Sequence, residues 1–155
     1  PILLVKANPI RTIDEEIENH LKRMVRIMYQ YNGIGLAAPQ IGLSLRLIIA
    51  RRENWIYKLI NPKISWTNGE AIAYEGCLSL PNEIWEVERA KEVVVEGYDS
   101  TGKEQSILAN DLLARVFQHE IDHLDGIMIN SIGTLIGQEE EKKNEKENSV
   151  EQVEH

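Results

Sequence analysis

Five short runs of β-type residues, joined by short loops, constrain the fold of this chain more than any other feature of its sequence. The runs are rich in aliphatic and aromatic residues and span 45–50, 57–60, 71–74, 84–87 and 93–98. Because the loops between them are short, the strands are expected to pair antiparallel rather than through helical crossovers. A further run at 105–109 follows residues 99–102, whose composition is typical of a hairpin turn.

A first amphipathic helix is predicted over residues 13–30. Thr12 is followed three residues later by Glu15, which is the capping-box pattern of a helix start. Asn32-Gly33 is expected to end the helix, because glycine adopts the left-handed conformation without a steric penalty. Apolar residues recur at helical spacing between these ends, at Ile17, Leu21, Met24, Val25 and Met28.

A second helix is predicted to begin at Asn110 or Asp111 and to end at Gly126. It contains the sequence His119-Glu120-Ile121-Asp122-His123. Histidines four residues apart lie on one helix face, so both imidazoles can bind one cation, and Glu120 can reach the reacting water without being a ligand. The same five residues could also occur by chance on a helix surface, so a metal site requires a third ligand.

Cys77 is the candidate for that third ligand. The histidine-ligand position of one large protease class is occupied here by Ile129, and the glutamates downstream lie in a polar tail that is a poor scaffold for a ligand. An isolated cysteine is more often a buried core residue. Its neighbours Gly76 and Pro81 suit a ligand site, however, and one cysteine with two histidines leaves a fourth position open, as in catalytic zinc sites.

Length and composition indicate one globular domain at residues 1–137 and a polar, flexible tail at 138–155. The chain has 155 residues and 43% hydrophobic content, with no apolar run long enough to span a bilayer. The tail carries seven Glu and three Lys, which accounts for −4 of the net charge of −8. An acidic body without a Lys/Arg cluster argues against DNA binding. A lone cysteine fits a reducing, intracellular setting.

Three separated segments together resemble the peptide deformylase family. They are the glycine- and alanine-rich segment 33–40, which ends in Gln40, the cysteine segment 75–79, and the histidine segment 118–123. They occur in the family's order and spacing. The resemblance implies an α+β fold in which antiparallel β-sheets pack around a central helix that carries the HExxH motif. It also implies removal of the formyl group from the N-terminal formylmethionine of nascent peptides, with release of formate.

The resemblance assigns the chemistry to particular residues. Cys77, His119 and His123 would bind one divalent metal ion, usually Fe(II), with zinc, nickel or cobalt able to replace it. Glu120 would carry the proton. The Gln40 side-chain amide and the backbone N–H of Leu78 would donate hydrogen bonds to the oxygen that becomes negatively charged.

Four residues are expected to contact the substrate. Gly35 and Gly76, which lack side chains, would let backbone lie close to the substrate, and Ile34 and Val116 would line an apolar pocket for the methionine side chain. Leu112 is a further candidate. Ordinary core packing is the alternative interpretation for Ile34, Val116 and Leu112, and it is favoured for Leu112. Glu75 is the candidate partner for a ring nitrogen of a metal-binding histidine, and an ordinary surface carboxylate is the alternative.

The expected partners are N-formylmethionyl nascent peptides and the ribosome exit region, with no DNA and no membrane. We expect a monomer in the bacterial cytoplasm, with an organelle as the alternative location. Two rival functions remain: an HExxH metallopeptidase that cuts internal bonds, and a deformylase-like protein that binds formylated chains without turnover. Glu120 argues against the second, because a purely structural site needs no base.

Overall fold

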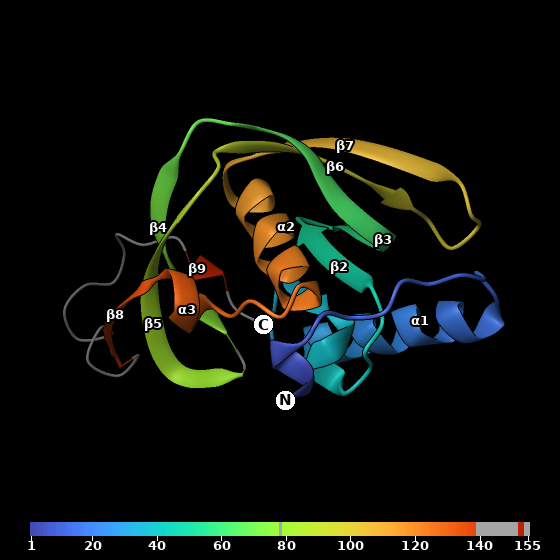
Figure 1. The fold of residues 1–155 in the computed structure, drawn as a ribbon, viewed down its shortest axis with the longest axis horizontal. Coiled ribbons are helices and arrows are strands. Elements are labelled where there is room, and N and C mark those ends of the chain that lie inside the picture. The colour runs from blue at the N-terminus through green and yellow to red at the C-terminus, as the bar shows by residue number, and fades with distance from the viewer. Residues whose placement is uncertain (78, 139–151, 154–155) are drawn as a thin grey trace.

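The computed structural model describes residues 1–77, 79–138 and 152–153 (Figure 1). Among these residues no helix is long and apolar enough to cross a membrane. The elements are η1 (Ile2–Leu4), α1 (Glu15–Gln30), β1 (Gly35–Ala37), η2 (Ala38–Ile41), β2 (Leu47–Arg52), β3 (Trp55–Asn68), β4 (Ala71–Cys77), β5 (Leu80–Arg89), β6 (Glu92–Tyr98), β7 (Glu104–Asn110), α2 (Asp111–Leu124), α3 (Ile129–Ile132), β8 (Thr134–Gln138) and β9 (Gln152–Val153).

Two sheets flank the second helix, which confirms the predicted α+β fold with antiparallel pairing. One sheet has the strand order β1-β2-β3-β6-β7, and the other has the order β8-β5-β4-β9. Neighbouring strands pair antiparallel, except that β9 runs parallel to β4. In Figure 1, α2 lies between the β4–β5 hairpin on one side and β2 and β3 on the other.

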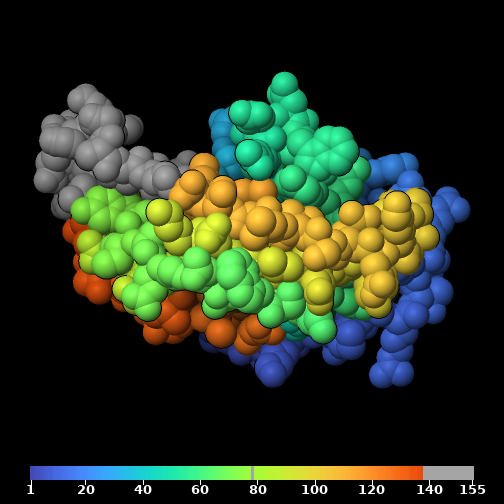
Figure 2. Space-filling model, turned by 90° about the horizontal axis from the view of Figure 1, so that it is seen from above, coloured from blue at the N-terminus to red at the C-terminus, as the bar shows by residue number. Residues whose placement is uncertain are grey.

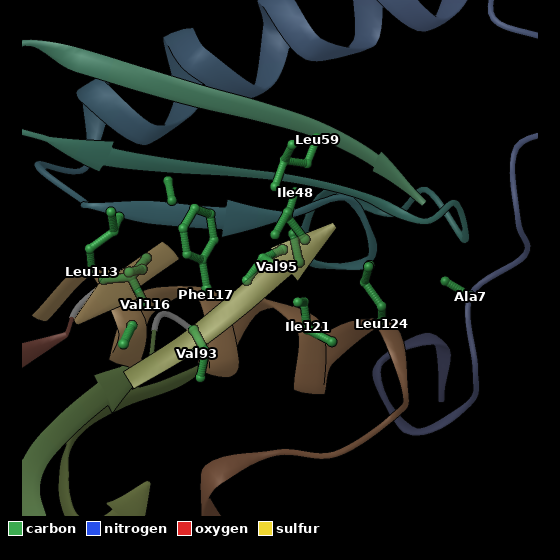
Figure 3. Packing of buried hydrophobic residues seen from close by; sticks show 14 residues of the cluster. Ala7, Ile48, Leu59, Val93, Val95, Leu113, Val116, Phe117, Ile121 and Leu124 are labelled. Carbon is green, nitrogen blue, oxygen red and sulfur yellow. The ribbon is translucent and has the colours of Figure 1, made fainter. Parts of the chain in front are cut away.

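The five-stranded sheet is covered on both faces where β1 and β2 lie. Successive residues of a strand point to opposite faces. Ile48 therefore packs in the cluster that contains Phe117 of α2, whereas Ile49 packs in the cluster that contains Leu21 and Met24 of α1. Figure 3 shows the first cluster, in which α2 side chains meet those of the sheet. The position of α2 is thus fixed by apolar burial along one face, which leaves its other faces for polar residues.

The first helix begins at a different residue from the one the capping pattern indicates. Asp14, not Thr12, is the N-cap, and its side chain accepts a hydrogen bond from the backbone N–H of Ile17 at 3.2 Å. At the other end Asn32, rather than Gly33, has the left-handed conformation, with φ of 55°. Asparagine tolerates this region better than most residues. The helix therefore ends at the predicted place, but Asn32 and not Gly33 adopts the left-handed conformation.

The third strand is much longer than the apolar run at 57–60 that predicted it. Asn61 takes φ of 52° and its side chain hydrogen-bonds both the N–H and the C=O of Ile10, at 2.8 and 2.9 Å. The register against β6 shifts at this point and the strand continues as a polar, partly exposed segment to Asn68. Seen from above, the green-to-gold residues of β3, β6 and β7 form much of one face of the molecule (Figure 2).

Several short elements escaped the sequence patterns, namely β1, α3, β8 and β9. The expectation of a flexible tail at 138–155 falls largely outside the described residues.

Candidate metal centre

The two histidines of the HExxH sequence lie on the polar side of α2, as the spacing predicts. His119 and His123 are both only 1% exposed, and their ring centroids are 5.0 Å apart. Gly126, with φ of 76°, follows the helix end, as expected. The helix alone therefore holds two imidazoles close together in a buried setting.

Cys77, at the end of β4, completes a group of three donor atoms. Its Sγ lies 3.5 Å from Nε2 of His123, and one donor atom each from Cys77, His119 and His123 lie within 4.8 Å of one another. A sulfur and a nitrogen that share a tetrahedral zinc-type ion lie about 3.6 Å apart. The spacing and the chemistry of the three donors thus fit a single divalent metal ion.

Glu75 orients one of these histidines. Its Oε1 lies 2.7 Å from Nδ1 of His119, so this nitrogen donates to the carboxylate and Nε2 is the atom suited to bind metal. Arg89 donates to both oxygens of Glu75, at 2.6 and 2.9 Å, and also to Asp122 at 2.8 Å. Arg115 donates a further hydrogen bond to Glu75. The predicted role of Glu75 as a histidine partner is therefore borne out by the contacts.

Burial and charge act in opposite directions on Glu75. Burial alone would raise the pKa of this carboxyl, but hydrogen bonds from His119 and Arg89 outweigh burial and hold the pKa far below its usual range. Burial lowers the pKa of His119, and it lowers the pKa of His123 to about 3. An ionised Glu75 beside two neutral imidazoles is the protonation state that a histidine metal site requires.

The thiol of Cys77 is not activated by the protein alone. Burial raises its pKa to about 11, although hydrogen bonds from Ser79 act in the opposite direction. A coordinating cation deprotonates a thiol outright. The protein therefore supplies the position of the sulfur, and thiolate formation depends on the bound ion.

Glu120 is buried beside the donor group, against β1. The side chain is 0% exposed, and burial raises its pKa well above the ordinary value. A methyl group at Gly35 would lie 2.6 Å from Oε2 of Glu120 and 2.7 Å from Cγ1 of Val116. Gly35 is thus needed so that the strand can approach the helix. A carboxyl group with a raised pKa can hold and return a proton near neutral pH.

Gln40 reaches the centre from η2. Its Oε1 accepts a hydrogen bond from the backbone N–H of Ala37 at 2.9 Å, which fixes the amide so that Nε2 lies 3.8 Å from Sγ of Cys77. The donor end of the amide therefore points toward the metal centre. Leu78, the other predicted donor, lies outside the described residues.

The residues predicted to line the methionine pocket belong to the main core cluster or pack against it, rather than lining an open surface. Val116 is fully buried in the main core cluster, with Ile34 and Leu112 partly buried against it. Gly76 lies in β4 between Glu75 and Cys77. A cleft of about 640 Å³ opens beside Gln40, and its lining residues are Arg23, Ile27, Gln30, Tyr31, Leu36, Gln40, Ile41 and Ser79.

Arg115 and Asp122 are the functional candidates that sequence reasoning missed or left unassigned. Arg115 is buried and donates to Glu75, whereas Asp122 is partly exposed and accepts a hydrogen bond from Arg89. A signal was present for Arg115, because it precedes His119 by four residues and therefore shares its helix face. A charged residue on a helix face that is otherwise buried requires a partner.

Comparison with known proteins identifies relatives over most of the chain. A family model described as polypeptide deformylase matches residues 1–149. The peptide deformylase of Carboxydothermus hydrogenoformans is 51% identical over 128 residues, which cover 83% of this chain and 84% of that protein.

Two solved structures have the same fold. A peptide deformylase from Thermus thermophilus has a TM-score of 0.81 at 42% identity, covering 84% of this chain and 79% of that one. A peptide deformylase from Synechococcus elongatus in complex with actinonin has a TM-score of 0.80 at 42% identity, covering 83% and 71%.

Proposed function

The chain belongs to the peptide deformylase family, and from that premise we infer that its metal centre removes the N-formyl group from peptides that begin with formylmethionine. Water is consumed in the reaction. Its oxygen bonds to the formyl carbon, the bond between this carbon and the methionine nitrogen breaks, and the nitrogen receives a proton. The products are formate and a peptide with a free amino terminus.

One observation carries this proposal. Cys77, His119 and His123 bring three donor atoms within 4.8 Å of one another, and the buried carboxyl of Glu120 follows directly on His119 in the same helix. A hydrolytic metal site has three protein ligands and a nearby carboxyl group that does not bind the metal, whereas a structural site has four protein ligands.

The roles of the side chains follow from their positions. A divalent ion held by these ligands would lower the pKa of water and polarise the formyl oxygen. Glu120 takes the proton from water and returns it to the leaving nitrogen. The Nε2–H of Gln40 would donate to the oxygen that gains negative charge, and the likeness to the family assigns the backbone N–H of Leu78, which lies outside the described residues, as a second donor. One such donor is worth about 3 kcal/mol.

Selectivity for formyl follows from the closed surroundings of the centre. The formyl carbon carries only hydrogen besides its oxygen and nitrogen, so it can enter a space that excludes a full amino-acid residue. Gly35 and Gly76 provide close backbone approach beside this space. The proposed apolar wall for the methionine side chain is Ile34, which is partly buried, together with Val116, which is fully buried in the core in this structure. The close approach of Gly35 to Glu120, where an added methyl group would lie 2.6 Å from the carboxyl oxygen, supports the role of Gly35.

Fe(II) is the proposed metal, with zinc, nickel or cobalt as substitutes that the same donors accept. The proposed substrates are formylmethionyl nascent chains, which the protein would meet near the ribosome exit. Bacterial sources of the relatives favour the bacterial cytoplasm as its location, and we propose that it acts there as a monomer of one catalytic domain, 1–137.

The test is formate release from a formyl-Met peptide by protein prepared without oxygen and analysed for metal. Formate should appear in parallel with the free methionine amino terminus, and the unformylated peptide should remain intact. Cleavage of internal bonds in the unformylated peptide would instead indicate a metallopeptidase. Tight binding of the formylated peptide without formate release, by protein that contains its metal, would indicate a non-catalytic homologue.

A further inference from the structure

We propose that Arg115 is a positioning residue that sets the distance between the cysteine ligand on one element and the histidine ligands on another. This inference rests on the proposed ligand set of Cys77, His119 and His123. The histidines belong to α2, whereas the cysteine belongs to the β4–β5 hairpin. The geometry of the metal centre therefore depends on how the helix and the hairpin are held together.

Arg115 joins these two elements through three hydrogen bonds. Nη1 donates to the backbone C=O of Val87 at 2.9 Å and to Oε2 of Glu75, and Nη2 donates to the backbone C=O of Ala71 at 2.7 Å. Ala71 belongs to β4 and Val87 to β5, and the strands are paired here, with Ala73 opposite Val87. One guanidinium group thus binds both strands of the hairpin from the helix.

The contribution of Arg115 is distinct from that of Arg89. Arg89 already donates to both oxygens of Glu75, so the carboxylate keeps a cationic partner if Arg115 is removed. Arg89 lies on the hairpin itself, at the end of β5, whereas Arg115 lies on the helix. Arg115 therefore acts mainly by holding the hairpin in place against α2, and only secondarily by neutralising the charge of Glu75. Its side chain is only 4% exposed, so these bonds are made away from competing water.

Glu75 connects Arg115 to the metal ligands. Glu75 contacts Arg115, orients His119 at 2.7 Å, and precedes Cys77 by two residues on the same strand. A metal site tolerates ligand displacements of only about 0.2 Å. A hairpin that shifts relative to α2 would move Cys77 away from His123 and would rotate His119. Both changes weaken metal binding.

Gln118 provides a matched control. It joins α2 to the residue directly after the hairpin, because its side-chain amide pairs with the N–H and the C=O of Ala90, both at 2.9 Å. Among the described residues its side chain hydrogen-bonds Ala90 and Ala114 and not Glu75. Removal of Gln118 therefore loosens α2 from the segment that follows the hairpin without removing the contact that leads to His119.

The experiment titrates metal-free protein with Co²⁺ under anaerobic conditions, against a competing chelator, and follows the absorption band that a thiolate–cobalt bond produces. Wild type, Arg115→Met, Arg115→Lys and Gln118→Met are compared. Arg115→Met should bind cobalt about 10- to 100-fold more weakly, the usual effect of removing a residue that supports a ligand, with a weakened thiolate band. Gln118→Met should stay within about threefold of wild type.

Arg115→Lys separates position from charge. Lysine keeps the positive charge but lacks the planar fork that reaches two strands and a carboxylate together. It should therefore also lose cobalt affinity, to a smaller extent than methionine. Circular dichroism and thermal melting of the metal-free proteins identify variants that fail to fold, and if Arg115→Met is one of them, Arg115→Lys carries the test alone.

Three results would overturn the inference. Wild-type cobalt affinity in both Arg115 variants, or in Arg115→Lys alone, would exclude a positional role. Equal weakening by Gln118→Met would mean that general loosening of the helix from its neighbouring segments is the cause. If wild type itself bound cobalt without a thiolate band, the proposed ligand set would be wrong and the inference would fall with it.

Discussion

Gly35→Ala should impair the enzyme more than it destabilises the fold. The added methyl group would lie 2.6 Å from Oε2 of Glu120 and 2.7 Å from Cγ1 of Val116, and both residues are fully buried. An ordinary contact is about 3.5 Å, so the Glu120 carboxyl must move by roughly 1 Å or the strand must shift. Overpacking of this size costs about 1–3 kcal/mol of stability. A misplacement of about 1 Å in a reacting group can cost about 100-fold in rate.

The assay compares kcat/KM for formate release with the free energy of unfolding, on metal-analysed protein at a temperature where the variant is folded. Gly97→Ala is the control, because the nearest atoms to its methyl group would be the backbone oxygen of Ile60 at 3.1 Å and backbone atoms of Pro62, neither of which belongs to the metal centre. This control should lose stability but keep turnover within about twofold. A Gly35→Ala protein with normal metal content and kcat/KM within threefold of wild type would refute the reasoning.

Three further predictions concern the metal and the proton. Glu120→Gln should keep metal and fold but lose about 10²–10⁴-fold in turnover, and a loss below about tenfold, or ~1.4 kcal/mol, would contradict its assignment. Cys77→Ser should weaken metal binding, because a hydroxyl is a poor ligand compared with thiolate; unchanged metal content and activity would exclude Cys77 as a ligand. In air the iron form should lose activity faster than the nickel form, with oxidation of Cys77 detected by the mass of its peptide. Equal decay of both forms would remove metal redox chemistry as the cause.

Local patterns predicted the parts of this protein that depend on near neighbours in the chain. The spacing of His119 and His123 is a property of any α-helix, and the apolar face of α2 required only periodicity. The predicted start of α1 was two residues too early. Thr12 and Asp14 can both act as an N-cap, and the direction from which the preceding chain approaches the helix decides between them. The continuation of β3 past Asn61 was missed, because the hydrogen bonds of Asn61 to Ile10 connect residues far apart in sequence.

The sequence by itself predicted the two long helices, most of the longer strands with their antiparallel pairing and, through three motifs, the residues proposed to carry the chemistry. Tertiary structure alone decided how those residues meet. The distance of 3.5 Å between Cys77 and His123, the orientation of His119 by Glu75, and the role of Arg115 all depend on contacts between a helix and a hairpin. Periodicity reports which face of an element is buried, but it contains no information on the distance between two faces. That distance is set by the packing of the whole core and by buried hydrogen bonds between distant residues.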